Sequence, residues 1–80
     1  MSFSDYFNST NPNIASSANL LAGIQADYQN GAITQAQYTE LSNNVINDLQ
    51  NELSSLATMA ARQDIIVALQ AFAKLVAAVV

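Results

Sequence analysis

The sequence predicts an all-α protein: a helical hairpin with a short first helix and a long second helix, assembled into an oligomeric helical bundle. Apolar residues recur at helical spacing, a stop-and-restart signal lies at 30–34, and neither Gly nor Pro follows Gly31. The 80 residues include no Cys and no His, so disulfides and His/Cys metal sites cannot stabilise so small a core. We therefore expect oligomerisation or a host structure to do so.

Residues 1–14 are predicted to be an extended N-terminal arm, and residues 15–80 the helical hairpin. The turn-forming run at 8–13 favours local side-chain-to-backbone bonds over regular structure. Three aromatic residues of the arm, Phe3, Tyr6 and Phe7, are candidate anchors at spacings of three and four. They either fold back on their own chain or hold a neighbouring molecule. The arm lacks the basic and apolar regions of a signal peptide, so export by the usual route is not expected.

The first helix is indicated by apolar residues that recur on one face up to Gln29. These residues are Leu20, Leu21, Ile24 and Tyr28. Asn13, Ser16 or Ser17 is the expected N-cap, because each carries a side-chain oxygen that can accept a free backbone N–H.

The hairpin corner carries the best-defined local signal in the chain. Its residues are Asn30, Gly31, Ile33, Thr34, Gln37 and Tyr38. Gly31 tolerates the left-handed conformation that ends a helix. Thr34 and Gln37 have the spacing of a capping box, and Ile33 and Tyr38 that of a hydrophobic staple. We expect the second helix to begin here.

Two geometries compete for the second helix. An apolar stripe contains Leu41, Val45, Leu49, Leu53, Leu56 and Ala60, and from Ile46 its spacing also fits a short coiled-coil seam. A continuous helix from 35 to near 80 is preferred, because a break between Thr58 and Asp64, giving a three-helix bundle, needs a turn without Gly, Pro or a strong cap. The amide-rich opposite face is either simply solvated or suited to contacts between identical chains.

The C-terminal segment 65–80 is apolar except for Gln70 and Lys74, so a helix here must be buried in protein or in lipid. Sixteen residues reach about 24 Å, short of a bilayer core of ~30 Å, so burial in a protein bundle is favoured. A single long-helix chain cannot cover this segment, which predicts partners: self-association, other structural proteins, or both. The predicted assembly interface is Ile65, Ile66, Leu69, Phe72, Leu75, Val76 and Val79. The alternative is a holin-like or pore-forming protein that inserts residues 60–80 into a membrane.

The composition argues against catalysis and against nucleic-acid binding. Six acids against Arg62 and Lys74 give a net charge of −4, with too few cations to neutralise phosphates. No zinc pattern, nucleophile triad or glycine-rich phosphate loop is present. Asp48 and Glu52 lie four residues apart without an accompanying base, and we interpret them as surface residues. We expect a non-enzymatic protein without a metal ion or other cofactor.

Residues 27–41 carry the pattern D-Y-x-x-G-x-I-T-x-x-x-Y-x-x-L. Its fixed positions are Asp27, Tyr28, Gly31, Ile33, Thr34, Tyr38 and Leu41. With Leu20, Leu21 and Ile24 before it, this stretch resembles a helical hairpin that recurs in small bacterial and phage proteins. Together with the low charge and the apolar end, the chain is similar in character to minor structural proteins of tailed-phage virions, such as tail, baseplate or portal-associated components. The resemblance implies a virion location. Secretion-needle subunits are similar in length and plan, but this chain lacks their proline-bearing corner.

Overall fold

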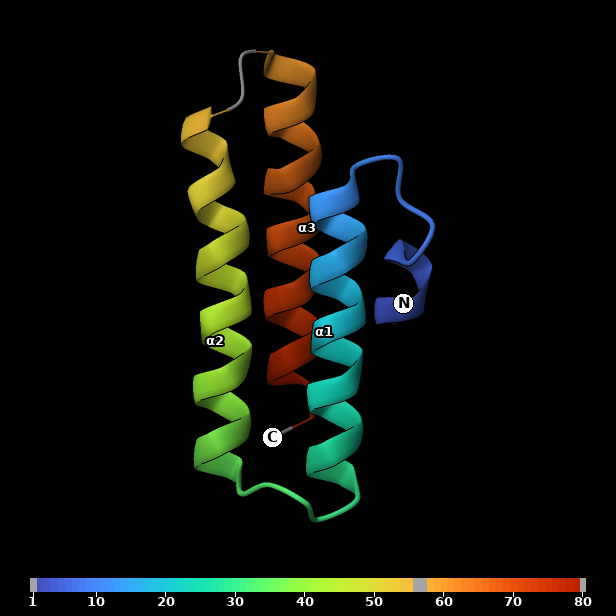
Figure 1. The fold of residues 1–80 in the computed structure, drawn as a ribbon, viewed down its shortest axis with the longest axis vertical. Coiled ribbons are helices and arrows are strands. Elements are labelled where there is room, and N and C mark those ends of the chain that lie inside the picture. Colours follow the sequence, from blue (N-terminus) through green and yellow to red (C-terminus); the bar gives the residue numbers. More distant parts are fainter. Residues whose placement is uncertain (1, 56–57, 80) are drawn as a thin grey trace.

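Three helices pack side by side in the computed structural model, which describes residues 2–55 and 58–79 (Figure 1). They are α1 (Pro12–Gln29), α2 (Gln35–Asn51) and α3 (Met59–Ala77), and two 3-10 helices accompany them, η1 (Phe3–Tyr6) and η2 (Glu52–Ser55). Consecutive α-helices run in opposite directions, in a body of 40 × 21 × 17 Å. The predicted all-α class is confirmed. The helix count is that of the three-helix alternative.

The chain reverses between α2 and α3 without Gly or Pro. Ser54 and Ser55 each donate through Oγ to the carbonyl oxygen three residues earlier, both at 2.9 Å. Hydroxyls that bond the backbone in this way compete with the helical hydrogen-bond ladder. Thr58 then caps α3, accepting the Ala61 N–H at 3.3 Å. The preferred continuous helix from 35 to near 80 is therefore wrong, because hydroxyl side chains supply the stop and the cap that it took to be missing.

Helix α1 begins at Pro12, earlier than the sequence predicted. Its N-cap is Asn11, whose side-chain oxygen accepts the N–H groups of Asn13 at 2.9 Å and Ile14 at 3.4 Å. Pro12 suits the first helical position, because the N–H that proline lacks would have no partner inside the helix there. The prediction of Asn13, Ser16 or Ser17 as the N-cap is therefore wrong, because Asn11 and Pro12 begin the helix earlier in the chain.

The N-terminal arm is folded rather than extended. The Ser2 N–H donates to the Asp5 carboxylate at 2.9 Å at the start of η1, and the Ser9 N–H donates to the Tyr6 carbonyl oxygen at 3.1 Å after it. The arm lies beside α1 on the side away from α2 (Figure 1). The predicted division of the chain into an arm of residues 1–14 and a separate helical part of residues 15–80 stays a prediction.

The core joins all three helices and the arm. Its buried members are Phe3, Ile14, Ala18, Leu21, Leu49, Ile65, Ala68 and Phe72. On α1 and α3 the buried positions are spaced by three, four and seven residues, so each helix presents one apolar face to the centre. Small side chains at Ala18 and Ala68 permit the helices to approach closely. A single chain thus covers most of its apolar end by folding α3 back against both α1 and α2.

The inward stripe of α2 is rotated from the predicted one. Tyr38, Ser42 and Leu49 are buried, whereas Leu41, placed on the core side by its spacing, is 42% exposed. The difference arises because α2 contacts both α1 and α3. The residues of α2 that lie between these two contact surfaces are the ones that face the core. Leu56 of the predicted stripe lies outside the described residues.

Candidate functional site

The hairpin corner forms as predicted. Gly31 has a φ of 77°, its N–H donates to the Tyr28 carbonyl at 3.1 Å, and the Ala32 N–H donates to the Asp27 carbonyl at 2.8 Å. This pair of bonds is the Schellman arrangement that ends a helix. The restart is equally local. Thr34 Oγ1 accepts the Gln37 N–H at 3.2 Å, and Gln37 Oε1 accepts the Thr34 N–H at 2.9 Å.

Tyr38 links the corner to the C-terminal end of α3. Its ring stacks on Tyr28 with centroids 4.7 Å apart, and its hydroxyl donates to the Val76 carbonyl oxygen at 2.9 Å. Burial of the phenol, together with the neighbouring Tyr28, raises the pKa of Tyr38 above the usual 10.0. Ile33, the other half of the predicted staple, is half-buried, and its contact with Tyr38 stays a prediction. The corner is therefore a structural joint between all three helices.

The aromatic anchors of the arm dock on their own chain. Phe3 is buried, and its ring centroid lies 5.8 Å from that of Phe72. Tyr6 meets Phe72 edge to face at 5.0 Å. Phe7 stays exposed beyond them. The sequence left open whether these aromatic residues fold back on their own chain or hold a neighbouring molecule. In the structure Phe3 and Tyr6 fold back on their own chain, and a role in holding a neighbour stays a prediction.

The predicted assembly interface on α3 faces mostly into the protein itself. Ile65 and Phe72 are fully buried. The other five members are half-buried: Ile66, Leu69, Leu75, Val76 and Val79. One chain therefore covers much of this segment, contrary to expectation, because α3 packs against α1 instead of continuing away from it.

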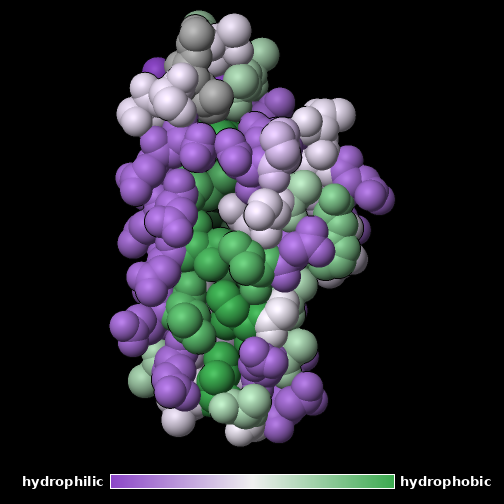
Figure 2. Space-filling view, in the orientation of Figure 1, coloured by the Kyte–Doolittle hydropathy of each residue, from purple (hydrophilic) through white to green (hydrophobic). Residues whose placement is uncertain are grey.

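Large apolar side chains that remain exposed lie elsewhere on the bundle. Leu20 on α1 is 56% exposed, Leu41 on α2 is 42% exposed, and Val67 and Met59 on α3 are 48% and 87% exposed. Figure 2 shows an apolar band along the long axis between two polar flanks, where Figure 1 has α2 on one side and α1 on the other. Helical spacing placed Leu20 and Leu41 on apolar stripes and did not identify either as exposed. One sequence signal of exposure was available for Leu41. It lies two helical turns before Asp48, so it shares a stripe of α2 with a charged residue.

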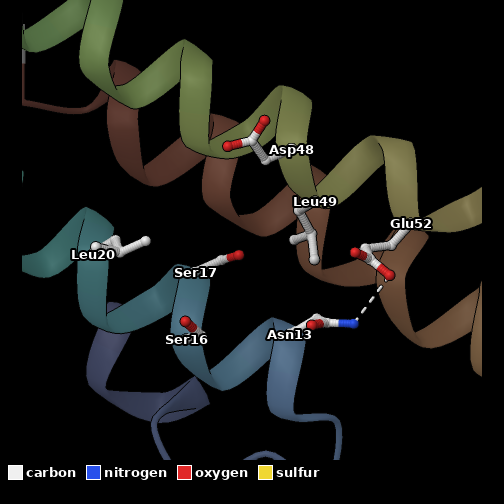
Figure 3. Close-up of a pocket in the computed structure, with 7 residues that line it drawn as sticks. All are labelled: Asn13, Ser16, Ser17, Leu20, Asp48, Leu49 and Glu52. Atoms are coloured by element: carbon white, nitrogen blue, oxygen red, sulfur yellow. Dashed lines mark hydrogen bonds between the residues drawn. The ribbon is translucent and has the colours of Figure 1, made fainter.

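A shallow groove of about 160 Å³ opens on this α1–α2 face (Figure 3). Its lining residues are Asn13, Ser16, Ser17 and Leu20 of α1, Asp48 and Leu49 of α2, and Glu52 of η2. Asn13 Nδ2 donates to Glu52 Oε2 at 3.2 Å and bridges one end of the groove. The groove therefore combines one exposed leucine with two carboxylates.

A second hollow lies on the arm side of the bundle. It has a volume of about 390 Å³, and its lining residues are Tyr6, Ser9, Thr10, Ile14, Asp64 and Val67. Asp64 is its single acidic lining residue, and no base or metal ligand accompanies it there. Throughout residues 2–55 and 58–79, no group of three or more Asp, Glu, His or Cys side chains is arranged to hold a metal ion.

The helices described here do not include one with the length and apolar character needed to cross a membrane. No family model, curated protein or solved structure matches the chain.

Proposed function

We propose that the chain is a non-enzymatic assembly subunit that docks exposed apolar side chains on other proteins. One observation carries the proposal: each of the three helices leaves at least one large apolar side chain exposed, and an apolar band crosses one face (Figure 2). Contiguous apolar surface on a small soluble protein is typical of an interaction site. The groove lining supports the same function, because apolar and carboxylate groups together suit a protein partner.

The docking surfaces in this proposal differ from the one that the sequence indicated. Ile65 and Phe72 pack inside the bundle, so the exposed positions Leu20 and Leu41 take the place of the apolar C-terminal helix as the principal contacts. Half-buried residues of α3, such as Leu69 and Val76, can still add area at an interface. A minor virion component of a tailed phage remains the specific form of the proposal, and the hairpin pattern at 27–41 is its support.

The test is the size of the particle in which the chain resides. We expect a tagged chain, produced in its natural host, to sediment in a complex far larger than its own mass of 8.5 kDa. The complex should lose the chain when Leu20 and Leu41 are both replaced by Ser, since both side chains are exposed and the fold does not need them. Recovery only as a free 8.5 kDa monomer would overturn the assembly function. Recovery in the membrane fraction, lost on Val67→Asp, would favour the membrane-active alternative instead.

A further inference from the structure

We propose that the α1–α2 face binds a cationic amphipathic helix of a partner protein. The inference rests on the assembly function proposed above and adds to it the surface and the chemical class of the partner. It follows from three features of the face: an apolar band, a carboxylate rim, and the absence of any cation on the two helices that form it.

The apolar part of the face runs along the groove between the two helices. Leu41 precedes Asp48 by seven residues, close to two helical turns, so both side chains lie on one stripe of α2. Asp48 lines the groove together with Leu20 of α1, which places Leu41 along the same groove toward the hairpin corner. Both leucines are about half exposed. An amphipathic helix laid in this groove would cover them with its own apolar stripe.

The acidic part of the face lies at the other end of the groove. Asp48 and Glu52 are one turn apart on the rim, and the Asn13 amide donates to one oxygen of the Glu52 carboxylate at 3.2 Å (Figure 3). Five acids occur before the first cation of the chain, Arg62, so α1 and α2 contain no Lys and no Arg. Charge complementarity must therefore come from the occupant, with Lys or Arg beside its apolar stripe.

A second copy of the chain fits this face poorly. In a two-fold contact the same patch meets itself, so the acids of one α1–α2 face would meet the acids of the other. The face offers Asp48 and Glu52, and α1 and α2 hold no cation to offset their repulsion. Like charges across an interface suppress association. The charge pattern therefore favours a cationic helix from another protein over self-association through this face.

The test uses a synthetic peptide as the probe. It has about 18 residues, long enough to form a helix on the surface, with Leu along one stripe, Lys on both sides of it, and one Trp. Since the chain itself has no Trp, the fluorescence of the peptide reports binding without background from the protein. We expect saturable one-to-one binding that weakens as the salt concentration rises from about 0.1 M to about 1 M, because the Debye length falls from about 10 Å to about 3 Å. A matched peptide with Glu in place of every Lys should not bind.

Four variants locate the binding site. Leu20→Ser and Leu41→Ser should each weaken the peptide about five-fold, as expected for losing the burial of half a leucine side chain. The double variant Asp48→Asn, Glu52→Gln should weaken it roughly three-fold to ten-fold at low salt and much less at high salt. Val67→Ser is the matched control, since Val67 is similarly exposed but lies on the arm side of the bundle, and its affinity should be unchanged. Circular dichroism should show every variant folded, because all of these positions except Glu52 are exposed.

Three results would overturn the inference. Equal binding of the Lys and Glu peptides would remove the role of charge. An equal loss on Val67→Ser and Leu20→Ser would move the site away from the groove. Concentration-dependent dimers of the chain alone that disappear on Leu20→Ser would assign the face to a second copy. A chain that enters a large complex in its host but does not bind the Lys peptide would refute this inference alone, whereas a chain that stays free would refute the assembly function.

Discussion

Replacing Tyr38 by Phe should destabilise the fold by a small, defined amount. The variant keeps the buried ring and its stacking on Tyr28 but removes the 2.9 Å bond from the hydroxyl to the Val76 carbonyl oxygen. That carbonyl also accepts the Ala78 N–H, so it is not left without a partner. The expected cost is therefore that of one neutral hydrogen bond, about 1 kcal/mol. For a domain of this size that corresponds to a fall in Tm of roughly 4–8 °C.

The same variant should remove a pH dependence. Burial raises the pKa of Tyr38 above 10.0 in the folded protein, so the folded state holds the phenol proton more tightly than the unfolded state. The stability linked to this group is complete below pH 10 and is lost as the pH rises from 10 through the folded-state pKa. Wild type should therefore lose more stability than Tyr38→Phe as the pH rises above 10.

Urea unfolding followed by circular dichroism at several pH values measures both effects. Tyr28→Phe serves as the control, because it keeps the Tyr38 hydrogen bond and should retain most of the alkaline loss. The linkage between α2 and α3 would be refuted if Tyr38→Phe unfolded within about 0.3 kcal/mol of wild type, the usual limit for independent sites. Parallel decline of wild type and Tyr38→Phe at alkaline pH would refute the reasoning about the phenol proton.

Three further predictions concern the packing and the caps. Ser42→Ala should raise the free energy of unfolding by about 1 kcal/mol, because the buried Ser42 hydroxyl has no hydrogen-bond partner among the described residues; a lower urea midpoint would contradict this. Phe3→Ala should cost about 3 kcal/mol and speed hydrogen exchange in η1 more than in the helices, and an arm that stays protected would show that the Phe3 ring does not hold it. Thr34→Ala should cost about 1 kcal/mol in thermal unfolding, whereas Thr39→Ala, on the exposed side of α2, should cost less than half as much; equal costs would argue against the capping box.

The groove on the α1–α2 face is a product of tertiary structure. Leu20 and Leu41 were read as apolar members of helical stripes, which predicts burial for both. Their exposure follows from the position of α3, which lies behind the α1–α2 pair and draws the core line of α2 to Tyr38, Ser42 and Leu49. Hydrophobic periodicity identifies which face of a helix is apolar. It does not show which part of that face the neighbouring helices will cover. The groove was therefore beyond the reach of spacing alone.

The helical class, the corner and the caps of the corner follow from the order of residues alone. Those features depend on bonds within a few residues of one another, such as the Gly31 and Thr34 interactions, and short-range chemistry can be read from the order of residues. The break in the predicted second helix depends on how the helices pack together. The hydroxyls of Ser54, Ser55 and Thr58 provide only a weak local stop signal. The break becomes favourable because it lets α3 fold back and bury Ile65 and Phe72. Removing these two side chains from water outweighs the helical hydrogen bonds that are lost at the turn.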